Sequence, residues 1–207
     1  SIYVITSEWS KEFKNIENRN SEPMYYENLP FRFDTKGIIY NKRAHVYKVN
    51  IQTKKFTKIV DGDANDIISI SSLVEGEKGI VLSFDQYNLK GTMLEEKIGA
   101  IEGSKIKETY SKGSMGNLFY YEGYLHAVGM RKRFDWPTNT SILKISSSGK
   151  VSFKYPSFDR NVVKAEVYEG ILYFLYEDSG KTLLRDSTNN IDLINSEITI
   201  KDFAFNN

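Results

Sequence analysis

The sequence predicts an all-β fold, and three observations lead to it. Val, Ile, Tyr and Phe are gathered in short runs, aromatic residues reach 14%, and the 207 residues include only 4 Pro. These residue types suit a pleated, half-buried surface. The periodicity of an amphipathic helix is hard to find in the chain, and a turn followed by an apolar run recurs at a fixed interval.

That recurring unit is an acid-glycine turn within the segments VEGEKGIVLSF, YEGYLHAV and YEGILYFLY. Its acids, Glu75, Glu122 and Glu169, lie 47 residues apart. The extra EKG in the first copy leaves the register of that strand open. Two further strands are predicted after each turn, and four antiparallel strands repeating at this interval are typical of a β-propeller blade.

We therefore predict a β-propeller of four-stranded antiparallel blades over residues 1–207. Three complete blades are expected, one part-blade before them, and the first strand of a next unit after them. Their ranges are about 66–110, 117–155 and 162–195 for the blades, 1–60 for the part-blade and 197–205 for the strand. The chain is then part of a larger propeller. The alternative is a closed four-bladed ring, in which the C-terminal strand pairs with the N-terminal ones and removes two exposed edges.

Strand character in the last copy predicts which residues share a face. The segment VVKAEVY alternates, so Val163, Ala165 and Val167 are expected on one face. The following segment, ILYFLY, is apolar on both faces. Continuous apolarity predicts a central strand buried between two packed sheets.

Charge and composition bound the function classes. The formal net charge is +1 and the basic pairs are dispersed among acids, so there is no electrostatic argument for nucleic acid or an anionic membrane. No run approaches the length of a membrane span. The chain contains no Cys, which excludes disulfides and thiol chemistry and fits a cytoplasmic location.

The sequence predicts no catalytic motif. The nearest approach to the G-x-S-x-G elbow of serine hydrolases is KGSMG around Ser114, but Lys112 replaces the first Gly and no helix follows. We interpret Ser114 as a turn residue. The chain has only 2 His, and His126 lies among apolar residues of a predicted central strand, where a packed histidine is expected.

Metal and cofactor sites are not predicted either. No H-x-x-H or H-E-x-x-H spacing occurs. The segment DGDAND, residues 61–66, resembles the start of a calcium loop, yet Asp66 and Ser72 stand where Gly and Glu are needed. An Asx-rich turn between strands is the better interpretation.

A long polar stretch precedes the strand AHVYKVN and interrupts the β pattern. It predicts an insertion between two strands of one blade, and loops of that length are usually functional or form interfaces. Within it, Arg32 and Asp34 are close enough to pair or to contact another domain. The alternative is a salt-bridged loop that braces its own blade.

Residues 29–66, LPFRFDTKGIIYNKRAHVYKVNIQTKKFTKIVDGDAND, carry a further pattern. A Pro is followed by Arg-x-Asp, a Gly, an Arg-x-His before an aromatic strand, and a D-G turn. This resembles the propeller domain of archaeal and bacterial acylaminoacyl-peptidases, within the prolyl oligopeptidase family. Phe33 and the TKG segment depart from the usual pattern around the Arg-x-Asp core. The matching positions are Pro30, Arg32, Asp34, Gly37, Arg43, His45, Tyr47, Asp61 and Gly62.

The resemblance implies a propeller joined to an α/β-hydrolase domain of the same polypeptide, which would hold the Ser-Asp-His triad absent from this chain. The propeller would limit entry to short peptides, with no cofactor. Arg32, Asp34, Arg43 and His45 are the candidates for substrate gating or domain contact. The alternative is a stand-alone propeller that binds a protein or a small ligand. A lyase or hydrolase with its site in the central channel would need several converging His or carboxylates.

Overall fold

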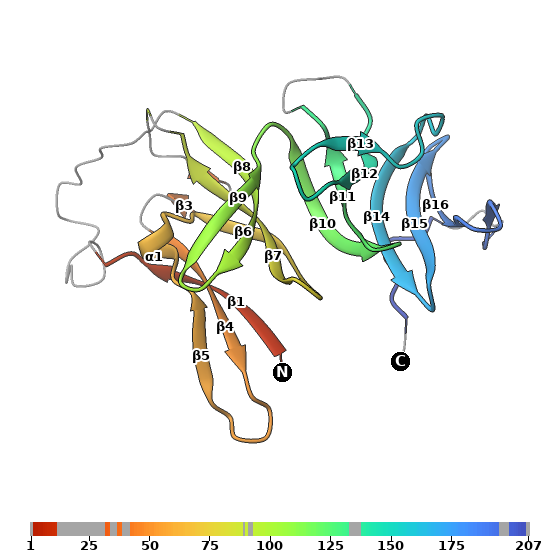
Figure 1. The fold of residues 1–207 in the computed structure, drawn as a ribbon. Coiled ribbons are helices and arrows are strands. Elements are labelled where there is room, and N and C mark those ends of the chain that lie inside the picture. The colour runs from red at the N-terminus through yellow and green to blue at the C-terminus, as the bar shows by residue number, and fades with distance from the viewer. Residues whose placement is uncertain are drawn as a thin grey trace.

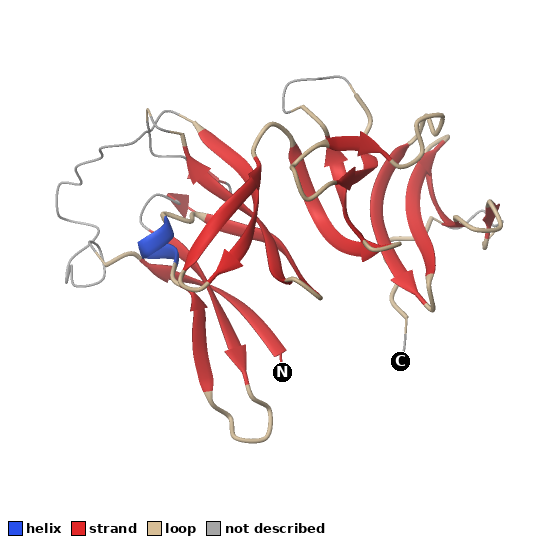
Figure 2. Ribbon diagram, in the orientation of Figure 1, coloured by secondary structure: helices blue, strands red, loops and turns tan. Residues whose placement is uncertain are grey.

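The structure is a computed structural model that describes residues 2–11, 32–33, 37–38, 42–88, 90, 93–132, 138–194 and 199–205. Three four-stranded sheets and one three-stranded sheet, all antiparallel, follow one another in chain order across the molecule (Figures 1 and 2). The predicted all-β class is confirmed. Within the described ranges the one helix is a single turn, so no helix there could cross a membrane.

The strands of each sheet are adjacent in sequence, in the order expected for blades. The first sheet contains β1 (Ile2–Trp9), β4 (Lys42–Val49) and β5 (Phe56–Val60). The second contains β6 (Ser69–Gly76), β7 (Gly79–Tyr87), β8 (Leu94–Glu102) and β9 (Lys105–Tyr110). The third contains β10 (Ser114–Tyr121), β11 (Tyr124–Met130), β12 (Ser141–Ile145) and β13 (Val151–Phe153). The fourth contains β14 (Asn161–Tyr168), β15 (Ile171–Asp178), β16 (Lys181–Asp186) and β17 (Ile191–Asp192).

The predicted insertion lies between two paired strands. Strands β1 and β4 run antiparallel from the pair Ile2–Val49 to the pair Trp9–Lys42. Between them, β2 (Arg32–Phe33) and β3 (Gly37–Ile38) form a small hairpin, and helix α1 (Gly62–Asn65) follows β5. The long polar stretch therefore separates neighbouring strands of one sheet, as the sequence predicted.

Two of the three acid-glycine pairs form the expected hairpin turns. Glu122 and Glu169 have φ of 50° and 49°, each followed by a Gly with positive φ, which is the backbone of a two-residue hairpin turn. In the first copy, Gly76 pairs with Gly79, so that turn is Glu77-Lys78 and Glu75 is still in the strand. The extra EKG thus moves the first turn by two residues.

The core consists of three apolar layers, one between each pair of successive sheets. Val46 and Leu82 lie in the layer between the first two sheets, while the adjacent Val81 packs with Met115 in the next layer. The third layer joins β10–β12 to β14 and β15. A second strand such as β7 therefore contributes side chains to layers on both of its faces, as continuous apolarity predicted.

The predicted shared face of Val163, Ala165 and Val167 is wrong at Val163, because β14 contains a bulge there. Val162 pairs with Tyr176 and Lys164 with Leu175, which leaves Val163 as the extra residue. The bulge reverses the alternation before it, so Val162 is 2% exposed and Val163 is 46% exposed. Ala165, after the bulge, is buried as expected.

This difference in burial predicts that alanine substitutions at Val162 and Val163 change the free energy of unfolding by different amounts. Val162→Ala is expected to lower the free energy of unfolding by about 1–2 kcal/mol, since it removes two buried methyl groups. Val163→Ala is expected to change it by less than about 0.5 kcal/mol, as for other exposed positions. Urea unfolding of both variants measures the difference. A larger loss of stability for Val163→Ala than for Val162→Ala would contradict the bulge and indicate that side chains alternate without interruption along β14.

The predicted first strand of a next unit, 197–205, is not formed over residues 199–205, which have no strand pairing. They pack on the fourth sheet instead. The Ile200 amide donates to the Thr182 carbonyl at 3.1 Å, and the Phe205 ring stacks on Tyr168 at 4.5 Å. The first and last sheets lie at opposite ends of the row in Figure 1, and the strand pairing that would close a four-bladed ring is absent among the described residues.

Candidate functional site

Strand β4 directs two of the predicted site residues at the segment that links the first two sheets. Arg43 and His45 share one face of the strand because side chains alternate. The Arg43 guanidinium lies 2.9 Å from a carboxylate oxygen of Asp66. His45 is 1% exposed, and its Nδ1 accepts a hydrogen bond from the Gly62 amide at 3.1 Å. Both residues hold the link 61–66 against β4.

Helix α1 explains why this link has an Asx-rich sequence. The Asp61 side chain caps the helix by accepting from the Asp63 amide at 3.1 Å. Asp66 ends the helix with φ of 51°, a conformation that Asp tolerates better than most residues. Gly62 lies so close to β4 that a Cβ there would be 2.1 Å from the Ala44 carbonyl oxygen. The turn interpretation of 61–66 fits these contacts.

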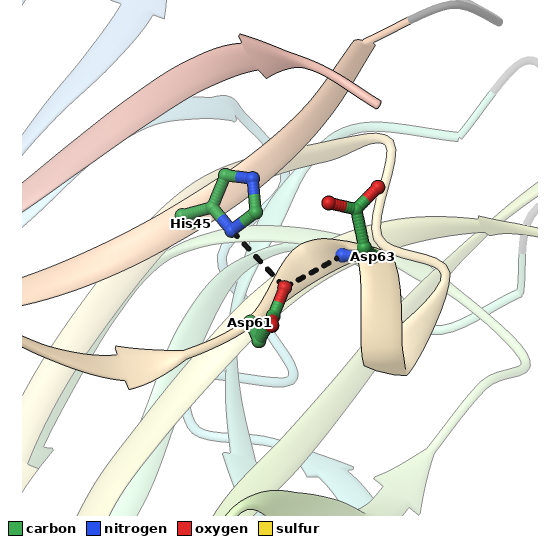
Figure 3. A group of neighbouring side chains, drawn as sticks. All are labelled: His45, Asp61 and Asp63. Atoms are coloured by element: carbon green, nitrogen blue, oxygen red, sulfur yellow. Dashed lines mark hydrogen bonds and ion pairs between the residues drawn. The ribbon is translucent and has the colours of Figure 1, made fainter. Parts of the chain in front are cut away.

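His45, Asp61 and Asp63 form a cluster in which one nitrogen and two carboxylates approach within 4.8 Å of one another (Figure 3). The His45 Nδ1 lies 3.4 Å from an Asp61 oxygen. Its lone pair already accepts the Gly62 N–H, so the ring is neutral with its proton on Nε2, and the contact with Asp61 is not an ion pair. A cation bound here would have to displace that hydrogen bond and the helix cap. The geometry therefore favours a structural role for the cluster.

Burial sets the protonation of this cluster. Burial and the nearby Lys58 ammonium lower the pKa of His45, against the opposing effect of Glu8 and the two aspartates. Burial alone would raise the pKa of Asp61, but Lys58 and the Asp63 amide together lower it. A neutral imidazole beside an ionised carboxylate is thus the stable state near pH 7.

His126 is the second buried histidine, and it lies in the third sheet. It is 0% exposed, its Nδ1 lies 3.0 Å from the Tyr124 carbonyl, and its ring stacks on Phe119 at 5.5 Å. Burial lowers its pKa, as do Lys154 and Lys144, while the Tyr124 contact opposes the shift. Its Nε2 has no partner among the described residues. These contacts agree with the prediction that His126 is a packed histidine.

Two buried neutral histidines predict that stability falls at mildly acidic pH. A histidine in the unfolded chain titrates near pH 6.5, and both folded pKa values lie below it, so the unfolded state binds more protons as the pH falls through that range. The histidine contribution is complete above about pH 6.5 and is lost below it. Carboxylates with a lowered pKa, such as Asp61, stabilise the fold over this whole range and lose their contribution only at lower pH. Urea unfolding at pH 7.5 and 5.5 measures the loss, and His45→Gln and His126→Gln should each reduce it. An unchanged pH dependence in both variants would contradict this assignment.

Ser114 lies in a strand and not in the predicted turn. It begins β10, and its Oγ donates to a carboxylate oxygen of Glu96 at 2.7 Å. Glu96 also accepts the Met115 amide at 2.8 Å, so it ties the third sheet to the second. Neither histidine bonds to a serine among the described residues.

The other two predicted site residues are not brought to this cluster by any described contact. Arg32 lies in β2, and Asp34 falls outside the described residues. Their predicted role in gating or domain contact stays a prediction. Sequence reasoning also missed the partners of Arg43 and His45, because nothing local links a strand residue to a turn 17 or more positions later.

A cleft of about 660 Å³ opens between the second and third sheets, at the end where their hairpin turns lie. Its floor is apolar and its rim is polar. The floor includes Val81, Ala100, Leu125 and Ile145; the rim includes Tyr120, Tyr121, Tyr124, Glu75, Glu77, Glu122, Lys78 and Lys107. An apolar floor in a cleft of this volume is a feature of small-molecule sites, and the charged rim would favour a polar ligand. Sequence reasoning missed it because its walls come from two different blades.

Comparison with known proteins identifies the fold. The chain superposes on Pyrococcus horikoshii acylaminoacyl peptidase, orthorhombic crystal form, with a TM-score of 0.63 over 93% of this chain. The fold is a β-propeller fold. The uncomplexed form of the same enzyme gives 0.61 over 88%, and an acylaminoacyl peptidase in complex with Z-Gly-Gly-Phe-chloromethyl ketone gives 0.60 over 88%. Sequence identity is 14% in each case.

The chain spans less than a third of each of these structures, between 27% and 29% of their length. No family model matches the sequence, and no curated protein matches it. The likeness is therefore one of architecture, in the propeller part of a longer peptidase chain.

Proposed function

We propose that residues 1–207 are the propeller portion of a serine peptidase similar to acylaminoacyl peptidase. The observation that carries this is the superposition of 93% of the chain on 29% of that enzyme. The Arg-x-Asp and Arg-x-His pattern of residues 32–45 adds local support. In this proposal an α/β-hydrolase domain of the same polypeptide carries the triad, and the protein acts in the cytoplasm.

The propeller's role would be to restrict which substrates reach the hydrolase domain. Rows of tightly packed blades form a rigid wall, because interiors packed at this density deform little. A short or unfolded peptide can pass an opening that excludes a folded protein. The insertion between β1 and β4, with Arg32 and Asp34, is the proposed contact between the propeller and the hydrolase domain.

The first test is the intact mass of the protein purified from its natural source. A mass well above 23.8 kDa, with peptides containing a G-x-S-x-G segment and labelling by a serine-directed fluorophosphonate, is expected. A mass near 23.8 kDa without labelling would overturn the proposal. The gating role is tested separately, by comparing cleavage of short N-acylated peptides and of folded proteins by the intact enzyme and by its isolated hydrolase domain. Loss of size discrimination in the isolated domain supports gating; equal discrimination overturns it.

The cleft between the second and third sheets supports a second candidate, a stand-alone propeller that binds a small ligand. A panel of short peptides, free and N-acylated, can be titrated by NMR. Binding in the cleft should shift the amides of Gly76 and Gly123, and Tyr120→Ala should weaken it because Tyr120 lines the rim. No shift at these amides, or unchanged binding in the variant, would count against this candidate.

A further inference from the structure

The first sheet has three strands where the other three sheets have four. Chain order indicates which position is vacant. In each complete sheet we call the first strand in chain order innermost and the last strand outermost. The outermost strand then leads into the innermost strand of the next sheet, as β9 leads to β10 and β13 to β14. Strand β5 leads to β6 in the same way. By this order β5 is outermost, β4 third and β1 second, and the innermost place next to β1 is vacant among the described residues.

Contacts between sheets assign the same places independently. Near its start, the third strand of a sheet forms a hydrogen bond with the segment that begins the innermost strand of the following sheet. Thr140, next to β12, accepts the Val162 amide at 2.9 Å. Glu96 in β8 accepts the Met115 amide at 2.8 Å. In the first sheet Ala44 of β4 plays this part, donating to the Ile67 carbonyl at 2.9 Å.

The burial of β1 differs from that of the three other second strands. Strands β7, β11 and β15 each contain a run of at least three consecutive buried residues, because each has a strand on either side and a sheet packed on at least one face. No residue of β1 is buried. Ile2, Val4 and Ile5 are 52%, 37% and 43% exposed. An apolar strand with one unpaired edge is an unstable arrangement in water unless something covers it.

We propose that this edge is completed by an extended segment of the same polypeptide, paired antiparallel with β1 and joined to it by a tight turn. The complete sheets define this occupant. Each innermost strand, β6, β10 or β14, is 8 residues long, antiparallel to its neighbour, and connected to it by a two-residue turn. The inference rests on sheet order and burial, and holds whether or not the protein is a peptidase.

The repeat also specifies one side chain of the occupant. Each innermost strand contains a bulge. In β10 and β14, an amide in the bulge or just after it donates to a polar side chain of the preceding innermost strand. Ser72 Oγ accepts the Leu118 amide at 2.8 Å, and Asn117 Oδ1 accepts the Ala165 amide at 2.6 Å. The bulge of β6 lies at Ser71, between Ile70 and Ser72. The occupant is expected to place a Ser, Thr or Asn beside it.

The test adds the missing strand and measures protection of β1. One variant carries NVVKAEVYEG, copied from β14 and its turn, directly before Ile2. Its control carries the same segment with two of its three valines, the copies of Val162 and Val167, replaced by proline, which cannot join the sheet. Hydrogen exchange of peptides covering Ile2–Trp9 is expected to slow, and the melting temperature to rise, in the first variant only. Equal exchange in the two variants would overturn the proposal.

Hydrogen exchange of β1 in residues 1–207 and in the intact natural protein distinguishes the proposed segment from other segments that could cover this edge. Fast exchange of β1 in residues 1–207 and slow exchange in the intact natural protein are expected. Slow exchange in residues 1–207 that disappears when 199–207 are deleted would mean that the chain's own C-terminal segment covers the edge. Slow exchange that depends on protein concentration would mean a second copy does so. Either result overturns the assignment to a segment preceding β1.

Discussion

Replacing Phe174 by alanine is expected to lower the free energy of unfolding by about 3–5 kcal/mol, the usual cost of removing a buried aromatic ring. Phe174 is 2% exposed in β15, within the apolar layer between the third and fourth sheets. Its ring contacts Phe158 edge to face at 5.2 Å and stacks with Tyr155 at 5.9 Å. The substitution removes dispersion contacts to both sheets and leaves a cavity that rigid strands cannot fill.

Phe56 provides the matched control, because it is also a strand phenylalanine but is 64% exposed in β5. Phe56→Ala is expected to change the free energy of unfolding by less than about 0.5 kcal/mol. Phe174→Leu should give an intermediate loss, since it keeps most of the apolar volume. Urea unfolding with a common m-value measures all three. Similar losses for Phe174→Ala and Phe56→Ala would mean that the third layer is not packed as described.

Gly62→Ala is expected to cost about 2–4 kcal/mol, and the reason is space rather than backbone conformation. Gly62 does not have a positive φ, yet its Cβ would lie 2.1 Å from the Ala44 carbonyl oxygen and 2.9 Å from its carbon. Relief requires β4 to move away from the link 61–66. That movement strains the packing by about 1–3 kcal/mol and weakens the bond from the Gly62 amide to His45 by about 1 kcal/mol.

Gly116→Ala is the control for this substitution, since Gly116 also lacks a positive φ and a Cβ there would meet nothing within 4 Å. It should be neutral or slightly stabilising, because Ala restricts the unfolded chain more than Gly does. Thermal unfolding of the two variants separates the effects. The exchange rate of the residue 62 amide adds a direct readout, as it should rise only in Gly62→Ala. Equal stability of the two variants would contradict the close approach of this link to β4.

Local sequence was enough to predict strands, hairpin turns and the buried second strands. Strand β15 reads ILYFLY because both of its faces are covered, and a Gly follows Glu122 and Glu169 because a two-residue hairpin turn needs positive φ. These features depend on residues within a few positions of one another. The packed state of His126 followed from its apolar neighbours for the same reason.

What the tertiary structure decided involves residues far apart in the chain or shifts of a single residue. A bulge moves Val163 to the surface, and alternation alone cannot reveal it because the partner strand sets the register. The candidate site changed most. His45 was predicted from the pattern around it, but its contact with Gly62, and so its structural role, comes from a link folded back onto β4. The propeller class was determined by periodic local pattern, whereas the pairing of polar groups and the vacant edge of β1 were decided by which strands become neighbours, since hydrogen bonds and burial depend on distance in space.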